Sequence, residues 1–390
     1  MSFAPPRRRT RRAVSLSLAV GAAVACATTP AAFAKDSTVV ADGLANPRGL
    51  TIGPNGDLFV AEAGKGGSGA CIGGPEGDVP SCVGATGAIT RVDPASGAKK
   101  ALVSDLPSLA AQTGDTPGGD AIGPQDISFS GKTGFFTVGL GAPPDARDTL
   151  GSDGKALGKL WRVDADGDVH EVVDLAAYEA ANDPDQTDPA AEGADSNPFS
   201  VDATGRSLLV TDAGGNDLLR VTKGGDVRTV AVFPFGKALA PPSLGLPPGT
   251  EVPYQPVPTG VIRGSHGDAI VGQLTGFPFP VDKANIFRVH GRDVSVEFDG
   301  FTNVVDVGKG KDGALYVVQI TSTGLAGPPS PGKLIRIDRD GKQTELLAGQ
   351  LQEPTGVTVS AQGDVYVTNN GGSPTDGQIL RVAAADTGGD

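Results

Sequence analysis

The sequence predicts an all-β fold, a six-bladed β-propeller with four antiparallel strands in each blade. Three observations support this prediction. The 390 residues include 58 glycines and 31 prolines, a content of helix breakers that argues against a helical protein. A short strand rich in Val, Ile, Phe and Tyr recurs six times, each time followed by an arginine-bearing strand. The last repeat lacks an outermost strand, and a suitable strand lies near the N-terminus.

The N-terminal segment, 1–34, is expected to be a secretory signal peptide. Arginines precede the apolar run 13–27, and a small-residue motif ends at Ala34, the expected cleavage site. This run is short for a membrane span. We therefore expect a secreted protein, exported by the general or the twin-arginine route, with lipid anchoring at Cys26 as a minor alternative.

The mature segment, 35–390, is expected to form a single propeller domain. The six blades are expected at residues 45–106, 120–175, 196–234, 256–300, 301–350 and 352–384, and residues 36–44 complete the last one. Closing the ring in this way protects the edge strands from pairing with other chains.

Each blade is expected to begin with an innermost strand and to continue with a second strand that ends in a polar or small residue. The innermost strands are expected at 49–52, 126–129, 200–202, 260–262, 306–308 and 356–359. The second strands are expected at 57–62, 134–139, 207–212, 268–273, 314–319 and 364–369.

The third strand of every blade carries an arginine at the same place. These residues are Arg91, Arg162, Arg220, Arg288, Arg336 and Arg381. A catalytic residue is rarely needed six times, so we expect a structural role between blades. The outermost strands are expected at 101–106, 169–175, 227–233, 294–298 and 344–347, with 37–41 as the sixth.

Candidate ligand-binding residues lie on the face where second strands end and innermost strands start. The second strands end at Glu62, Gly139, Asp212, Gln273, Gln319 and Asn369. The innermost strands start near Arg48, Gln125, Asp126, Asn303 and Asp306. Unlike the arginines, these residues differ between blades, which favours a specialised site; the alternative is that they hold ordered water. His170, His266 and His290 lie away from this face, so histidine acid–base chemistry is not expected there.

Two Phe-Pro clusters are expected in loops on the same face. They are Phe233-Pro-Phe235 and Phe277-Pro-Phe279-Pro280. Exposed neighbouring aromatic rings favour an apolar or aromatic ligand, or a protein partner. The alternative is a lid that packs onto its own blades.

The charge of the chain is strongly negative. The full sequence has a net charge of −13, and the signal segment contains five arginines and no acid, so the mature chain carries −18. This charge opposes nucleic-acid and anionic-membrane partners, and no later segment is apolar enough to be a transmembrane segment. The oligomeric state does not follow from the sequence.

Two segments could attract a cation. The acidic segment from Tyr178 to Asp195 is expected to be a solvated loop, with a bound calcium ion as the alternative. Asp164-Ala-Asp-Gly-Asp168 resembles the start of a calcium loop, but the same position in other blades is a hairpin turn, and we expect one here. No cofactor is certain, and a divalent cation, calcium, is the candidate.

The mature chain contains two cysteines, Cys71 and Cys82, in a glycine-rich stretch. In an oxidising compartment a nearby pair is most simply a disulfide. A metal site is less favoured, because two thiols without a nearby histidine make an incomplete coordination shell.

Four motifs resemble the ScyD/ScyE family. They are Asp195-Ser-Asn-Pro-Phe199, Asp212-Ala-Gly-Gly-Asn216-Asp-Leu-Leu-Arg220, Leu274-Thr-Gly-Phe-Pro-Phe-Pro280 with Ala284-Asn285, and Gly300-Phe-Thr-Asn303-Val-Val-Asp306. Members of this family are exported bacterial β-propellers, named after proteins encoded with scytonemin biosynthesis. The resemblance covers the mature chain and implies fold and export, but no established activity.

More distantly, the chain is similar to propellers with NHL repeats and to the SMP-30/gluconolactonase enzymes. Those lactonases hold a divalent metal with Glu, Asn and Asp, and Glu62, Asp212 and Asn369 supply these residue types by position. The first hypothesis is a non-catalytic propeller that binds a small molecule or a protein at the channel face. The expected ligand-binding residues are Arg48, Glu62, Asp126, Asp212, Asn216, Gln273, Phe277, Phe279, Asp306, Gln319 and Asn369. A metal-dependent hydrolase or lactonase is the alternative.

Overall fold

Six antiparallel sheets follow one another along the chain, as the repeat predicts. The computed structural model describes residues 36–387 apart from 75–76, 115, 187 and 189–192, all within one compact unit. The expected signal segment 1–34, with its cleavage site at Ala34 and Cys26, lies outside the described residues. No helix in the described part of the chain is long and apolar enough to cross a membrane.

Every blade has four strands ordered from the channel outward. Blade 1 consists of β2 (Pro47–Ile52), β3 (Leu58–Glu62), β5 (Gly77–Val92) and β6 (Lys99–Ala111), with β4 (Cys71–Gly74) paired to the start of β5. Blade 2 consists of β7 (Pro124–Ser130), β8 (Thr133–Val138), β9 (Lys159–Val163) and β10 (Val169–Asp174). Blade 3 consists of β11 (Pro198–Asp202), β12 (Leu208–Asp212), β13 (Asp217–Val221) and β14 (Val227–Val232).

The second half of the propeller repeats this order. Blade 4 consists of β17 (Pro258–Arg263), β18 (Ala269–Gln273), β19 (Ala284–His290) and β20 (Asp293–Phe301). Blade 5 consists of β21 (Val304–Lys309), β22 (Leu315–Gln319), β23 (Lys333–Ile337) and β24 (Gln343–Leu346). Blade 6 consists of β25 (Gly356–Val359), β26 (Val365–Asn369), β27 (Gly377–Val382) and β1 (Ser37–Leu44).

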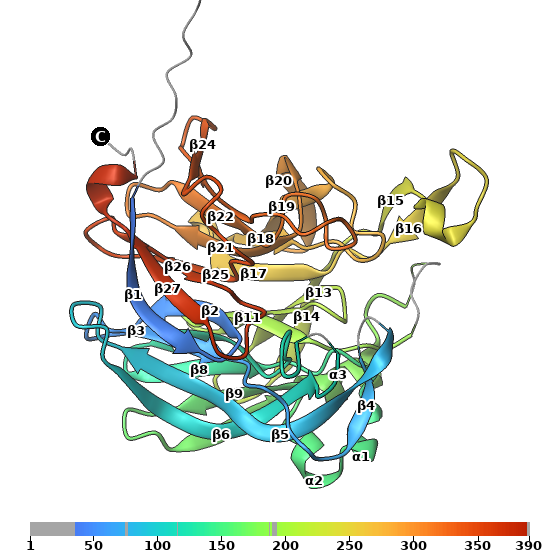
Figure 1. Ribbon diagram of the computed structural model, residues 1–390, viewed down its shortest axis with the longest axis horizontal. Helices are drawn as coiled ribbons and strands as arrows, with labels where there is room; N and C mark the ends of the chain where they lie inside the picture. Colours follow the sequence, from blue (N-terminus) through green and yellow to red (C-terminus); the bar gives the residue numbers. More distant parts are fainter. Residues whose placement is uncertain (1–35, 75–76, 115, 187, 189–192, 388–390) are drawn as a thin grey trace, which may run out of the picture. The chain divides into compact units, whose positions relative to one another are not determined.

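The N-terminal strand closes the ring, as predicted. β1 pairs antiparallel with β27, with Thr38 opposite Arg381 and Val39 opposite Leu380 (Figure 1). Each innermost strand contacts the innermost strand of the next blade, and β25 contacts β2. The last sheet therefore contains strands from both ends of the described chain. This pairing closes the ring between blade 6 and blade 1.

The hydrophobic core is divided among the blade interfaces. One cluster joins Phe135 of blade 2 to Val201 and Leu208 of blade 3, and corresponding clusters fill the other five interfaces. Phe233 belongs to the cluster between blades 3 and 4, where its ring lies 5.1 Å from that of Phe287. For Phe233 the packed alternative therefore holds and the exposed one does not, because this ring immediately follows β14 and faces the next blade.

Two further sequence expectations need correction. Blade 2 is offset by one residue: Val138, not Gly139, pairs with the start of the innermost strand, as Glu62 does in blade 1. Four of the six arginines of the third strands form ion pairs within their own blade, where contacts between blades were expected. Arg91, Arg288 and Arg381 pair with Asp57, Asp268 and Asp364, acids just before the second strand of the same blade, and Arg336 pairs with Asp312.

Several elements lie outside the repeat. A hairpin of β15 (Gly236–Leu239) and β16 (Glu251–Tyr254) connects blades 3 and 4 and projects from them (Figure 1). Helices α1 (Ala146–Thr149) and α2 (Gly151–Gly154) lie between β8 and β9. Helix α3 (Leu175–Asn182) follows β10, so the start of the acidic segment is helical rather than a solvated loop.

Candidate functional site

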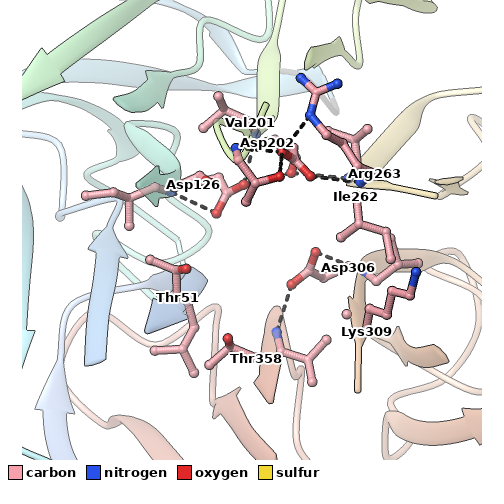
Figure 2. A pocket seen from close by; sticks show the side chains of 18 of the residues that line it. Thr51, Asp126, Val201, Asp202, Ile262, Arg263, Asp306, Lys309 and Thr358 are labelled. Atoms are coloured by element: carbon pink, nitrogen blue, oxygen red, sulfur yellow. Dashed lines mark hydrogen bonds and ion pairs between the residues drawn. The ribbon is translucent and has the colours of Figure 1, made fainter. Parts of the chain in front are cut away.

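A cavity of about 300 Å³ lies in the central channel, lined by residues from the innermost strands of all six blades. Its walls come mainly from the later parts of these strands, such as Arg263 and Lys309 at the ends of β17 and β21. Figure 2 shows Asp126 and Asp306 on different sides of the open space, with Thr51, Thr358 and Lys309 around it. This cavity therefore opens toward the ends of the innermost strands, whereas sequence reasoning favoured the face where they start.

Asp126 and Asp306 bridge neighbouring blades. Asp126 accepts hydrogen bonds at Oδ2 from the Val201 backbone N–H (2.9 Å) and the Ser200 hydroxyl (2.7 Å). Asp306 accepts one from the Val357 backbone N–H (2.7 Å). Innermost strands are sheet edges whose N–H groups lack a partner strand, so a side chain from the preceding blade takes that role.

Glycine stands at the same position in three of the six blades. The aligned residues are Gly49, Asp126, Ser200, Gly260, Asp306 and Gly356. A Cβ atom at Gly49 would clash with the Asp126 carboxylate, and one at Gly260 would clash with that of Asp306. The glycines therefore provide the space in which the two carboxylates lie across the blade interfaces.

Burial changes the acidity of both carboxyl groups. It raises the pKa of Asp126 to about 6, although the hydrogen bonds from Val201, Ser200 and Ile127 act in the opposite direction. The pKa of Asp306 is raised well above its ordinary value, first by burial and then by the charge of Asp126. Both carboxyl groups therefore keep their protons to a higher pH than exposed carboxylic acids do.

Three further charged residues line the cavity: two of them form an ion pair, and the third is exposed. Asp202 accepts from the Arg263 backbone N–H (2.8 Å), and its Oδ1 lies 3.2 Å from the Arg263 Nε. Lys309 is exposed, and no hydrogen bond or ion pair of its ammonium group occurs among the described residues. The cavity thus offers hydrogen-bond donors as well as acceptors to a ligand.

Arg48 lies at the other end of this region. Its guanidinium donates to the backbone carbonyls of Ala121 (2.7 Å) and Gly371 (3.0 Å), which belong to loops of neighbouring blades. Together with Gln125 and Phe199 it lines a second, very small cavity of about 10 Å³ that also touches Asp126 and Asp306. Arg48 therefore narrows the channel next to the two carboxyl groups.

The polar residues at the ends of the second strands bind loops of their own blades. Glu62 accepts from the Ala45 N–H (2.7 Å), Asp212 from the Asn197 N–H (2.6 Å) and Asn369 from the Gln352 N–H (2.7 Å). The side-chain oxygen of Gln273 accepts hydrogen bonds from the backbone N–H and the side-chain amide of Asn285. Gln319 is buried at the end of β22. Glu62, Asp212 and Asn369 thus each have a structural partner, and their use as metal ligands stays a prediction.

The second Phe-Pro cluster differs from the first. Phe277 is 49% exposed, and its ring packs edge-on against that of the half-buried Phe279, with centroids 6.3 Å apart. The nearby Val281 and Leu325 are also exposed. This cluster presents apolar surface, in contrast to the buried Phe233.

A cluster of acids forms where α3 approaches blade 3. Carboxylate oxygens of Glu179, Asp183 and Asp185 lie within 4.8 Å of one another. Asp185 accepts a hydrogen bond from the Asn216 amide (2.8 Å), and the buried Asp212 and Asp217 lie at either end of the β12–β13 turn that carries Asn216. Asn216 was predicted to bind a ligand, and it holds an acid of this cluster.

The acidity of Glu179 reflects its surroundings. Burial and then the charges of Asp212, Asp185, Asp183 and Asp195 raise its pKa to about 8. Asp217 has a pKa raised well above its ordinary value, again by burial first and by Asp212 and Glu179 next. The acidic segment could be identified in the sequence, but its contact with the β12–β13 turn could not be predicted from it.

Cys71 and Cys82 form a disulfide, as the sequence predicts, and it joins β4 to β5. The segment 164–168 is a hairpin turn, as predicted: the Asp164 carboxylate accepts from the backbone N–H groups of Asp166 and Asp168, both at 3.0 Å.

Comparison with known proteins gives the fold alone. No family model and no curated protein matches the chain. A protein from Thermus thermophilus, proposed to be an oxidoreductase (glucose dehydrogenase), is 16% identical over 89% of this chain and 99% of its own, with a TM-score of 0.50. A gluconolactonase from Xanthomonas campestris is 12% identical over 88% of this chain and 89% of its own, with a TM-score of 0.49. Virginiamycin B lyase from Staphylococcus aureus is 16% identical over 86% and 81%, with a TM-score of 0.42.

Proposed function

We propose that this chain is a secreted β-propeller of ScyD/ScyE type that binds a small hydroxyl-rich molecule, such as a monosaccharide or polyol, in its central channel. The observation that carries the proposal is the cavity of about 300 Å³ in which Asp126 and Asp306 face a common space from blades 2 and 5. This volume is at the lower end of the roughly 300–1,000 Å³ of small-molecule sites. The ligand is therefore small.

The chemistry of the lining favours a hydroxylated ligand. A hydroxyl group donates one hydrogen bond and accepts others, so it suits a site that offers both partners. The carboxyl oxygens of Asp126 and Asp306 accept hydrogen bonds, and the Lys309 ammonium group donates them. The hydroxyl groups of Thr51, Ser128 and Thr358 do either.

Binding is favoured over catalysis because both carboxyl groups already support the fold. Each accepts a backbone N–H of the next blade, and a reaction that moved either group would leave a buried donor without a partner. The lining residues therefore suit a fixed binding surface.

Calorimetric titration of the mature protein with glucose and with myo-inositol tests this proposal. At least one probe is expected to bind, and the paired substitution Asp126→Asn with Asp306→Asn is expected to abolish binding. Asp166→Asn changes an exposed acid of the β9–β10 turn and serves as the matched control. Binding unaffected by the paired substitution would place the ligand elsewhere, and a lack of binding at millimolar concentrations of both probes would refute the hydroxylated ligand.

Two other predicted sites have separate tests. If Phe277 and Phe279 bind an aromatic or apolar ligand or a protein, replacing both with alanine abolishes that binding with little change in melting temperature. If the chain is a metal-dependent hydrolase or lactonase, Glu62→Gln eliminates a bound divalent ion and activity on a panel of lactones.

A further inference from the structure

We propose that Glu179, Asp183 and Asp185 bind one calcium ion, which fastens α3 and the segment after it to the β12–β13 turn of blade 3. The site lies between blades 2 and 3 in the chain and is separate from the central channel. The inference does not depend on the proposed ligand of the channel.

The spacing of the carboxylates fits one ion. Ca²⁺ binds oxygens at about 2.3–2.6 Å, so two oxygens on one ion lie no more than about 5 Å apart. The carboxylate oxygens of Glu179, Asp183 and Asp185 meet this limit, since all lie within 4.8 Å of one another. Three acids from a helix, its C-terminal cap and the next turn therefore converge on one point.

A buried, unpartnered oxygen in the cluster provides a second observation. Glu179 is only 2% exposed, and its Oε1 has no hydrogen-bond partner among the described residues. The same is true of the buried Oδ1 atom of Asp183. Leaving a buried polar atom without a partner destabilises a fold, and more so when the atom belongs to a charged group. A cation between these oxygens would satisfy both atoms.

The charge of the cluster is not balanced by the protein. Asp212 and Asp217 are buried beside the three acids, and no Lys, Arg or His of the described chain forms an ion pair with any of the five. Buried charges normally occur in pairs or as metal ligands. A divalent cation supplies the missing positive charge.

The surrounding chain is built around the carboxylates. A Cβ atom at Gly215 would lie 2.8 Å from Oε2 of Glu179, so the glycine provides room for this side chain. The Asn216 amide donates to Oδ2 of Asp185 (2.8 Å) and orients that carboxylate. The Tyr178 hydroxyl accepts a hydrogen bond from the Thr229 N–H (3.1 Å), which holds α3 against β14.

The donor set selects the ion. All three side chains offer carboxylate oxygens, whereas zinc sites usually include His or Cys. Ca²⁺ tolerates irregular oxygen geometry, and Mg²⁺ demands a near-ideal octahedron. The three acids come from a short helix, its C-terminal cap and the turn at Asp185, so we expect the ion to be calcium.

Titration of the mature protein with calcium chloride, after treatment with EDTA and dialysis, tests the proposal. Calorimetry is expected to give one Ca²⁺ per chain with a Kd at or below about 1 mM, the range of extracellular sites. Calcium is also expected to raise the melting temperature, because it binds only the folded chain. The readout is metal binding alone and needs no channel ligand.

Three variants locate the ion. Glu179→Gln and Asp185→Asn are each expected to weaken binding at least tenfold, and Gly215→Ala is expected to weaken it without changing any charge. In EDTA, Glu179→Gln is expected to melt no lower than the unmodified chain, since glutamine keeps the size of the side chain and removes a carboxyl group from a cluster of acids, so a loss of binding cannot be due to unfolding. Asp166→Asn, in the calcium-loop-like turn 164–168, is the control and is expected to bind normally.

Three outcomes would overturn the inference. They are an absence of binding at millimolar calcium, equal affinity for Mg²⁺, and binding that Asp166→Asn removes while Glu179→Gln and Asp185→Asn leave it intact.

Discussion

Replacing Asp126 with asparagine should change how the stability of the propeller depends on pH. The folded protein raises the pKa of this carboxyl group from 3.8 to about 6, chiefly because it is buried. The native state therefore holds the proton more tightly than the unfolded chain does. Between about pH 4 and pH 6 the unfolded chain has released this proton and the native protein has not, so the contribution of Asp126 to stability decreases as pH rises.

The size of the effect follows from the two pKa values. One pKa unit corresponds to about 1.4 kcal/mol, so the change from 3.8 to about 6 removes about 3 kcal/mol by neutral pH. Asparagine does not titrate, so the stability of the variant does not show this decrease with rising pH. Its amide nitrogen replaces one acceptor oxygen, which costs about 1 kcal/mol at every pH. The variant should therefore be about 0.5 kcal/mol less stable than the unmodified protein near pH 4 and about 2 kcal/mol more stable near pH 7.

Urea unfolding of both proteins at several pH values from about 4 to 7 measures this difference. Asp306, Asp202, Arg263, Lys309 and Arg48 also face this part of the channel. They are common to both proteins, and subtraction removes their titration except that of Asp306, whose pKa should decrease when the charge of Asp126 is removed. Asp166→Asn, an exposed acid, is the control. Parallel stability curves, with a difference that does not change with pH, would refute the assigned burial of Asp126.

Two further predictions concern the core and the disulfide. Phe233→Ala should destabilise the fold by about 3–5 kcal/mol, because its ring is 1% exposed and packs on Phe287, whereas Phe277→Ala should cost less than about 0.5 kcal/mol. Melting curves compare the two, and equal losses would contradict the assigned packing. Cys71→Ser should cost about 3 kcal/mol, the chain-entropy value for closing a loop between cysteines 11 residues apart. Urea unfolding with and without a reducing agent checks this, and an unmodified protein indifferent to reduction would contradict it.

Much of the fold could be predicted from the sequence because each blade repeats one local pattern. The second and third strands lie close to their expected residues in every blade, and β1 completes blade 6 as predicted. The offset at Val138 and the hairpin of β15 and β16 were missed. The first is a difference in pairing register and the second is an insertion between two blades, and neither alters the repeated sequence pattern.

The candidate site was less predictable. Asp126 and Asp306 were singled out because they break the repeat, and they do line the cavity. The position of the cavity toward the other end of the innermost strands was not foreseen, since side-chain sizes around the channel, including those of Arg48 and Phe199, determine where space remains. No local sequence pattern predicts which of the two ends of the channel will be filled by side chains.

The sequence by itself determined the strands, their order and the closure of the ring, because hydrophobic periodicity and turn residues act over a few neighbouring positions. Only the tertiary structure decided which polar residues meet. Glu179 and the β12–β13 turn are more than thirty residues apart in the chain, and they become neighbours only after blade 3 has packed on blade 2. Likewise, Phe233 and Phe277 stand in similar Phe-Pro sequences, and their burial differs because only one of them faces an adjacent blade. Burial and charge proximity depend on the packing of the blades, and so does the chemistry that follows from them.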